Sequence, residues 1–526
     1  MNELQYRSNS PFTRARVAMA VAATLAGAPA FAAGTFPMEA SVASIQAAFQ
    51  AKELTCHHLV AGYLARIEAY DRKGPALRAM LAVNDQALAK ADELDAAYAK
   101  SGPVGPLHCI PVILKDNYNT ADLPTTDGSA SMAGMQPTQD AFVVTKLRAA
   151  GAVILGKANM HEFAVSGTTV SSLGGQTLNP YDLTRTPGGS SGGTGAAIAA
   201  NFGVLGTGSD TVNSIRSPAS ANSLVGFRPT KGLLSRAGIA PVCETQDAIG
   251  PITRTVADAA AMLAVMKGAD AADPSTAASV GQTPDDYKAA LDPNGLKGAR
   301  IGVVRTLFGS EPVHAEVNRV MAAAIATLKR AGATIVEIDD PALDTRTIGK
   351  QNDVQKYEFA ALMKDYLATI PNAPVHSVDD ILASGKYHQA STEKFLKTAA
   401  AIKDGFNDPD YKIRLQRNVA TRAAVERIMD ADQLDALVYP LQKRLVVPVG
   451  ELNQADRNGI LASATGLPAI TVPAGFSTPS ATAPIGVPVG MDMLGRAWSE
   501  PTLFKLAYAF EQASKVRKPP VSTPEL

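Results

Sequence analysis

The sequence has few cysteines, one tryptophan and no excess of charge of either sign. Its three cysteines, Cys56, Cys109 and Cys243, form at most one disulfide bond and leave one thiol over. The sequence has no C-x-x-C motif and no histidine–cysteine cluster with zinc spacing. The neighbours His57 and His58 would point in different directions on a helix. We therefore expect no structural metal. Lys and Arg total 49, as do Asp and Glu. This balance and the sparse aromatics argue against nucleic-acid or anionic-membrane binding and favour a small-molecule partner.

One long apolar run occurs, and it lies at the N-terminus. A leader with three arginines precedes "VAMAVAATLAGAPAFA" (residues 17–32), which ends in the small-x-small pattern Ala30-Phe31-Ala32 that signal peptidase cleaves. A transmembrane anchor would need about 20 apolar residues and no such cleavage site; a buried N-terminal helix is the remaining alternative. We therefore expect residues 1–33 to be a signal peptide, cleaved near Ala32 or Ala33, and the protein to be periplasmic or secreted.

The rest of the chain alternates helical patterns with short apolar runs. "AFVVTKLRAAG" followed by "AVILGKAN" predicts a helix, a glycine stop and a buried strand, and "VMAAAIATLKRAGATIVEID" repeats this order. "IPVIL" (Ile110–Leu114) predicts another buried strand. Thr55 is placed to cap a helix, and a further helix is expected over Val83–Lys100. The alternation predicts an α/β fold with a parallel or mixed sheet. Residues 34–526 show no linker and are interpreted as one domain, in which about 270–440 form a mostly helical covering region.

The stretch "TPGGSSGGTGAAIAAN" (Thr186–Asn201) allows three interpretations. A flexible linker would not run into the helix-forming "TGAAIAAN". A P-loop needs a lysine after its second glycine, which is missing here. The G-x-S-x-G pattern around Ser190 matches the nucleophile elbow of α/β-hydrolases, but the preceding "LNPYDLTRTP" is no strand and no suitable histidine follows. The remaining interpretation is a catalytic turn of another kind, which leads into a helix.

Two further segments, "LHCIPVILKDNYNT" (107–120) and "GTGSDTVNSIRSPASANSLVGFRPTKG" (206–232), complete a pattern that resembles the amidase signature family of serine hydrolases. The similarity extends to "TTDGSA", "GAVILGKANMHEF", "TQDAIGPITRTVADAA", "ATGLPAITVPAGF" and "PVGMDMLGRAWSEPTLFKLAYAFEQA", and so covers most of residues 40–515. The resemblance implies one large domain with a mixed sheet core covered by helices on both faces.

The family's Ser–Ser–Lys triad falls on Lys115, Ser190 and Ser214, and the resemblance implies a cis peptide bond before Ser190. In this mechanism Ser214 attacks, Ser190 passes the proton, and Lys115 acts as base, so no cofactor is needed. The lysine must be neutral, which burial after the apolar strand would achieve by lowering its pKa. The alternative, an exposed Lys115 paired with Asp116, is what the residues alone would favour.

The loop before the nucleophile departs from the family. The resemblance assigns the oxyanion hole to backbone N–H groups of Thr211, Val212, Asn213 and Ser214, but Val212 and Asn213 stand where two glycines are usual. Either the loop needs no positive φ at Val212, or the oxyanion site is remodelled. We hypothesise that these larger side chains narrow the acyl pocket.

Several nearby residues are expected to play supporting roles. Asp210 and Arg216 should brace the nucleophile loop, and Ser191 should supply a supporting hydroxyl. Cys109 is expected to be a small core residue, and Cys243 is a weak candidate for the pocket wall. The S-x-x-K run Ser391–Lys394 lacks the partner motifs of penicillin-recognising enzymes and is interpreted as a helix face.

These observations predict an exported amidase that acts on a primary amide, anilide, peptide amide or carbamate, with esters as easier substrates. Two alternatives remain. One is the A-type component of a tRNA-dependent amidotransferase, against which the leader argues. The other is a catalytically silent periplasmic binding protein with the same fold, which the departure at Val212 and Asn213 keeps open.

Overall fold

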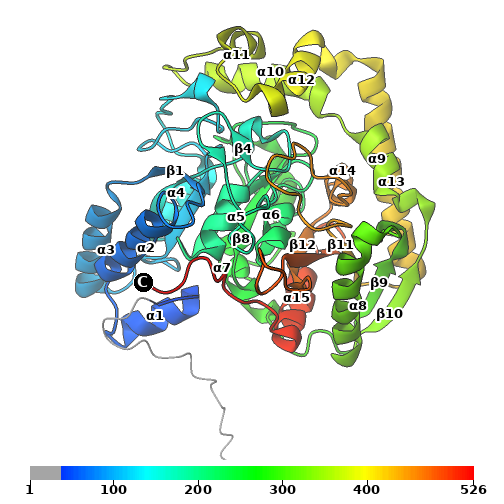
Figure 1. Cartoon of the computed structure of the whole chain (residues 1–526), viewed down its shortest axis with the longest axis horizontal. Coiled ribbons are helices and arrows are strands. Elements are labelled where there is room, and N and C mark those ends of the chain that lie inside the picture. The colour runs from blue at the N-terminus through cyan, green and yellow to red at the C-terminus, as the bar shows by residue number, and fades with distance from the viewer. Residues whose placement is uncertain (1–36) are drawn as a thin grey trace, which may run out of the picture.

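The computed structural model describes residues 37–526, and a mixed sheet of 11 strands forms its centre (Figure 1). The expected signal peptide lies outside the described residues. The strand order is β1-β3-β2-β6-β8-β7-β12-β13-β11-β9-β10, and β4 and β5 form a separate pair. The strands are β1 (Met80–Val83), β2 (Pro111–Lys115), β3 (Val153–Ala158), β4 (Val170–Ser171), β5 (Gly175–Gln176), β6 (Leu205–Asp210), β7 (Val225–Arg228), β8 (Ala248–Thr253), β9 (Arg300–Val304), β10 (Thr334–Ile338), β11 (Ala436–Pro440), β12 (Ala469–Phe476) and β13 (Pro488–Leu494).

Parallel pairing is confined to two parts of the sheet. β2 runs parallel to β3 and β6 on one side, and β9 runs parallel to β10 and β11 on the other, while the strands between them pair antiparallel. β2, β3 and β6 are buried along their whole length, which explains their continuous apolar runs. The expected strand over Ile110–Leu114 is confirmed with a shift of one residue, so that Lys115 itself ends β2 opposite Ala158.

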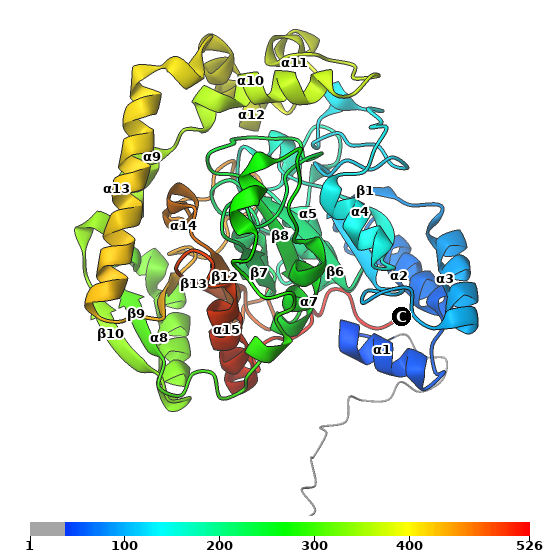
Figure 2. The same ribbon diagram turned by 180° about the vertical axis from the view of Figure 1, so that it is seen from behind.

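Helices cover both faces of the sheet, as the sequence predicts. α5 and α6 pack on one face, and α7 and α15 pack on the other (Figures 1 and 2). The helices are α1 (Val42–Gln50), α2 (Cys56–Tyr70), α3 (Ala87–Ser101), α4 (Phe142–Ala149), α5 (Gly192–Ala199), α6 (Arg216–Ala221), α7 (Val256–Met266), α8 (Ala315–Arg330), α9 (Thr345–Asn352), α10 (Gln355–Ala368), α11 (Val378–Ser384), α12 (Gln389–Ala401), α13 (Pro409–Ala431), α14 (Ile460–Thr465) and α15 (Glu500–Ser514). Among residues 37–526, no helix has both the length and the apolar content to cross a bilayer.

Local signals predicted the N-terminal helices with one error. Thr55 caps α2, accepting a hydrogen bond from the backbone N–H of His58 at 3.2 Å. The helix expected from Val83 begins only at Ala87, because Val83 pairs with Gly156 of β3 and so belongs to strand β1. Sheet pairing, a tertiary contact, overrides helix propensity at these positions.

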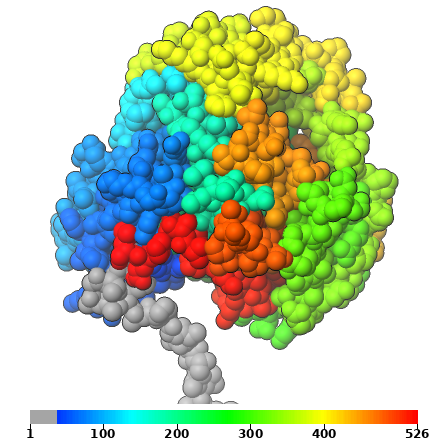
Figure 3. Space-filling view, in the orientation of Figure 1, coloured from blue at the N-terminus to red at the C-terminus, as the bar shows by residue number. Residues whose placement is uncertain are grey.

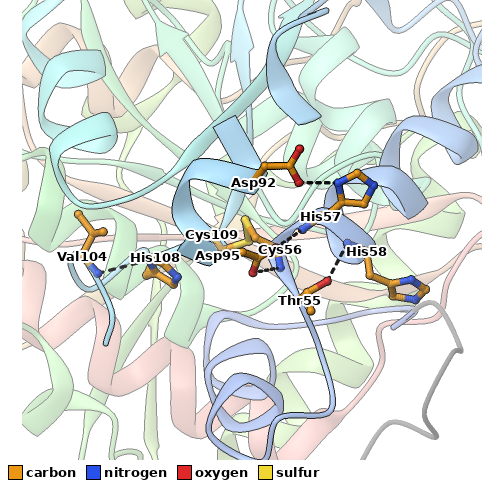
Figure 4. The surroundings of a disulfide bond; sticks show 9 residues. All are labelled: Thr55, Cys56, His57, His58, Asp92, Asp95, Val104, His108 and Cys109. Atoms are coloured by element: carbon orange, nitrogen blue, oxygen red, sulfur yellow. Dashed lines mark hydrogen bonds and ion pairs between the residues drawn. A yellow bond between two sulfur atoms is a disulfide. The ribbon is translucent and has the colours of Figure 1, made fainter. Parts of the chain in front are cut away.

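A disulfide bond joins Cys56, the first residue of α2, to Cys109, just before β2 (Figure 4). The carboxylate of Asp95 on α3 accepts hydrogen bonds from the backbone N–H groups of Cys56 and His57 at 2.7 and 3.0 Å, which holds the start of α2 against α3. Cys109 is therefore not simply a small core residue. It ties the N-terminal helices to the strand that ends in Lys115, and Cys243 is left as the free thiol.

Residues 270–440, which were expected to form a mostly helical covering region, do so only in part. Within it, β9, β10 and β11 belong to the central sheet, because their apolar runs pair with one another. Helices α10–α12 pack on a hydrophobic cluster of their own, which includes Phe163 and Phe359 in an edge-to-face contact with ring centroids 6.4 Å apart. Figure 3 shows these helices (yellow) along the top of the molecule. They stand over the loops that follow β2, β3 and β7 rather than over a face of the sheet (Figure 2).

Candidate functional site

Lys115 is fully buried at the end of β2, and its amine points at hydroxyl groups. Nζ donates hydrogen bonds to Ser190 Oγ at 2.6 Å and to Ser209 Oγ at 2.8 Å. The backbone N–H of Lys115 donates to Thr207 Oγ1 of β6 at 2.9 Å, which fixes the strand end. The amine therefore has two hydroxyl acceptors and, among the described residues, no carboxylate within ion-pair distance.

The environment of this amine favours its neutral form. Burial lowers the pKa of Lys115 to about 7, although the carboxyl groups of Asp127, Asp247 and Asp210 act in the opposite direction. The alternative pairing with Asp116 is not seen. The Asp116 carboxylate instead accepts from Thr126 and Gly128 and lies 3.7 Å from the amine of Lys157.

Ser190 lies in the turn that leads into α5, and the peptide bond between Gly189 and Ser190 is cis, as the family resemblance predicts. The hydroxyl of Ser190 has no exposed surface. Gly193 is required where α5 begins, because a Cβ there would collide with the backbone carbonyl of Asn159. Ser191 donates its backbone N–H to the Ser214 carbonyl at 3.2 Å, which ties the turn to the loop that carries Ser214.

The loop 211–214 presents free backbone donors. None of its four N–H groups donates a hydrogen bond within the described part of the chain, so they are available to an oxyanion. Val212 and Asn213 are absent from the residues with positive φ. The loop therefore keeps its shape without the glycines usual in the family, and the first of the two possibilities left open by the sequence applies.

Buried ion pairs support this loop from below. Asp210 lies between two fully buried guanidinium groups, with Arg216 Nε at 3.1 Å and Arg228 Nη1 at 3.0 Å. Arg216 also donates to the Val212 carbonyl at 2.7 Å and pairs with Asp492 at 2.7 Å. Burial alone would raise the pKa of Asp210, but the two guanidinium groups hold it below its usual value. Arg216 and Asp210 thus contact the loop rather than the cavity.

Ser214 is 5 % exposed and lines a cavity of about 450 Å³. The structure brings the side chains of Lys115 and Ser190 into contact. Ser214 is tied to this pair through the hydrogen bond from the Ser191 backbone. No hydrogen bond joins the hydroxyls of Ser190 and Ser214. Catalytic hydrogen bonds often tighten only when substrate is bound. The cavity wall comes from the loop 211–214, from α9, from Phe395 of α12 and from the segment before α14.

Two residues at this site were not singled out from the sequence. Ser209 accepts hydrogen bonds from Lys115 Nζ and from Asn117 Nδ2, the latter at 3.1 Å. Ser209 and Thr207 are two residues apart on the fully buried strand β6, and residues two apart on a strand share a face of the sheet. This spacing of hydroxyl residues could have identified Ser209 as a neighbour of Lys115 from the sequence. Asp127, in "TTDGSA", is 1 % exposed, and neither of its carboxyl oxygens has a hydrogen-bond partner among the described residues. Burial raises its pKa well above the usual value.

The other candidates lie elsewhere. Cys243 is fully buried in the cluster beneath α10 and does not line the cavity beside Ser214. Ser391 and Lys394 lie on α12, where Ser391 Oγ is 2.7 Å from His388 Nδ1 and Lys394 is exposed. Within residues 37–526 no group of three or more His, Cys, Asp or Glu side chains is placed to hold a metal ion.

Comparisons with known proteins identify the family and the fold of this chain. The model of the family described as Amidase matches residues 58–504. A probable amidase of Arabidopsis thaliana is 35% identical over 506 residues, covering 92% of this chain and 91% of its own. The A-type component of the glutamyl-tRNA(Gln) amidotransferase of Moorella thermoacetica is 35% identical over 484 residues, covering 89% of this chain and 95% of its own. The crystal structure of native peptide amidase from Stenotrophomonas maltophilia is similar with a TM-score of 0.80 at 38% identity, covering 92% of this chain and 98% of its own.

Proposed function

The chain belongs to the Amidase family, as a hydrolase acting on amide C–N bonds, and we propose that it is an exported amidase in which Ser214 attacks the carboxamide carbon. The observation that carries the mechanism is the contact of 2.6 Å between the buried amine of Lys115 and the hydroxyl of Ser190. A pKa of about 7 supports a lysine that is neutral in half of the molecules at neutral pH, as a general base must be.

Each proton has a defined path in this proposal. As Ser214 Oγ bonds to the carbonyl carbon, its proton passes to Ser190 Oγ and the Ser190 proton passes to Lys115 Nζ. The backbone N–H groups of 211–214 bind the oxyanion. The lysine then returns the proton through Ser190 to the leaving nitrogen, the C–N bond breaks, and an acyl-enzyme on Ser214 remains. Water attacks this ester over the same path and releases the acid.

Export is proposed on two grounds. The leader of residues 1–33 has the pattern of a signal peptide. The disulfide bond between Cys56 and Cys109 fits an oxidising compartment, because disulfides are rare in the cytosol. N-terminal sequencing of the periplasmic or secreted protein tests the proposal. A chain that starts near Ala33 supports it, and an intact Met1 on that protein contradicts it.

A fluorophosphonate probe tests the nucleophile. We expect labelling of the purified protein to disappear in Ser214→Ala and to persist in Ser391→Ala, which removes a hydroxyl from α12. Lys115→Ala and Ser190→Ala should slow labelling strongly, because each breaks the proton path. Folded wild-type protein that stays unlabelled would favour the catalytically silent binding protein.

The similarity to components of glutamyl-tRNA(Gln) amidotransferases supports a second candidate function, a part in transferring an amide group. Such a component would have to take its amide nitrogen from a donor such as glutamine. The leader and the disulfide bond favour the exported amidase over it. Glutamine hydrolysis by the isolated chain, compared with hydrolysis of a panel of peptide amides and anilides, distinguishes the two.

A further inference from the structure

The cavity that Ser214 lines carries more unpaired positive than negative charge. Three cationic side chains line it, those of Arg346, Lys350 and Arg457, and two carboxylates, those of Asp353 and Asp456. None of the three cations has a carboxylate within ion-pair distance in the described part of the chain. The chain as a whole has a formal net charge of zero, so this excess is a local property of the cavity.

Both carboxylates of the cavity already have partners. Asp456 lies 3.3 Å from His314 Nε2 and 3.6 Å from Arg444 Nε. Asp353 accepts two hydrogen bonds of 2.9 Å from the side-chain amide of Gln355, and burial raises its pKa. The charge of Asp456 is therefore offset by Arg444, whereas Asp353 has a neutral amide as its partner and acts on Arg457 through its charge. Against these two carboxylates the cavity holds three cations.

Arg457 contacts the residue that precedes the proposed nucleophile. Its Nη1 donates to Asn213 Oδ1 at 3.4 Å, one residue from Ser214, and the guanidinium lies against Gly167, where a Cβ would crowd Nη1. Burial lowers the pKa of Arg457. This long contact with a neutral amide is the one hydrogen bond that the Arg457 side chain makes in residues 37–526. A partly buried guanidinium with so few acceptors loses hydration without compensation.

A second donor without a partner lies beside it. Asn213 is fully buried, and its Nδ2 has no hydrogen-bond partner within the described residues. Asn213 replaces a glycine of the family pattern, so this pair of donors belongs to this chain. Asn213 Oδ1 orients the guanidinium of Arg457, and the free N–H groups of that guanidinium match the oxygens of a carboxylate.

We propose that Arg457, oriented by Asn213, binds a carboxylate of the substrate, so that the enzyme selects amides with an acidic group close to the scissile bond, such as peptide amides that end in an acidic residue. The proposal rests on Ser214 being the nucleophile. Arg457 acts here as a specificity-determining residue: it contributes to binding of the substrate and takes no part in proton transfer.

Matched substrates test the proposal. Acetyl-Ala-Glu-NH2 and acetyl-Ala-Gln-NH2 are nearly equal in shape and differ in the side-chain carboxylate, and mass spectrometry follows loss of the C-terminal amide. We expect kcat/KM of the wild-type enzyme to favour the Glu substrate about ten- to a hundredfold, mainly through KM, because hydrogen bonds to a charged group are worth that much. Arg457→Gln should remove the preference by weakening the Glu substrate, and Arg457→Lys should keep part of it.

The control variant is Arg422→Gln, which removes the same charge from an exposed i,i+4 pair with Glu426 on α13 and should leave the preference unchanged. Equal activity of the wild type on both substrates, or an equal loss on both in Arg457→Gln, overturns the inference and gives Arg457 a purely structural role. Fluorophosphonate labelling separates the two proposals. Labelled protein that cleaves neither peptide amide, or that prefers Gln, overturns this inference alone, whereas unlabelled wild-type protein overturns the nucleophile as well.

Discussion

The pH dependence of acylation follows directly from the burial of Lys115. With a pKa of about 7, the neutral fraction of the amine is about 1% at pH 5, about 10% at pH 6 and half at pH 7, whereas a lysine with the ordinary pKa of about 10.4 is only about 0.04% neutral at pH 7. In the proposed mechanism, desolvation thus increases the concentration of neutral Lys115, the competent base, at pH 7 by about a thousandfold.

We therefore expect the rate of fluorophosphonate labelling, and kcat/KM for an amide, to rise about tenfold between pH 5 and pH 6 and to level off above about pH 8. Stopped-flow or gel-based labelling in buffers of constant ionic strength measures this acidic limb of the pH–rate profile. A rate that keeps rising tenfold per pH unit up to pH 10 would mean an ordinary, hydrated lysine. A rate that is flat from pH 5 to pH 9 would mean that Lys115 is not the base.

A variant tests the cause of the shift. Among the carboxyl groups that raise the pKa of Lys115 against the effect of burial, Asp127 is the strongest. Burial raises the pKa of Asp127 itself, so Asp127→Asn removes a negative charge only at the pH values at which this carboxyl is ionised. There the pKa of Lys115 should fall and the acidic limb should move to lower pH, with the plateau rate retained. A limb that moves to higher pH would contradict this account of the site.

Three further predictions concern stability and the nucleophile loop. The Cys56→Ala/Cys109→Ala protein should have a free energy of unfolding lower by about 4 kcal/mol, as expected for a bridge across 53 residues. Its Tm in calorimetry should fall by about 4 °C, since a chain of this size unfolds with about 1 kcal/mol/K of entropy. Dithiothreitol should lower the Tm of the wild type and leave that of the variant unchanged. Asp210→Asn should cost about 3–5 kcal/mol in urea unfolding, because it leaves Arg228 buried without an anion and removes one of the two carboxylates that pair with Arg216. Asp379→Asn, at an exposed position on α11, should change the free energy of unfolding by less than about 0.5 kcal/mol. Val212→Gly/Asn213→Gly should extend hydrolysis to bulkier acyl groups, and an unchanged substrate range in an acyl-length series would refute a role for these side chains in narrowing the pocket.

Most of the fold could be predicted from periodicity. Continuous apolar runs such as Ile110–Leu114 predicted buried strands, and the helix–glycine–strand order predicted the α/β class. The errors arose where contacts between distant segments determine the secondary structure. Val83 joins strand β1 because β3 is beside it, and the polar stretch after residue 270 contains β9 because β10 and β11 pair with it on either side.

The sequence by itself determined which residues we propose to carry the chemistry. Its motifs placed a lysine at a strand end and two serines in glycine-rich and strand-following turns, since such local patterns depend on neighbouring residues. Tertiary structure alone decided what surrounds them. Three features depend on which distant segments pack together: the bond between Cys56 and Cys109, the second hydroxyl at the Lys115 amine, that of Ser209, and the position of Arg457 beside Asn213, 244 positions away in the chain. Burial and charge neighbours set the pKa of a lysine and the partner of a guanidinium, and neither can be read from a linear pattern.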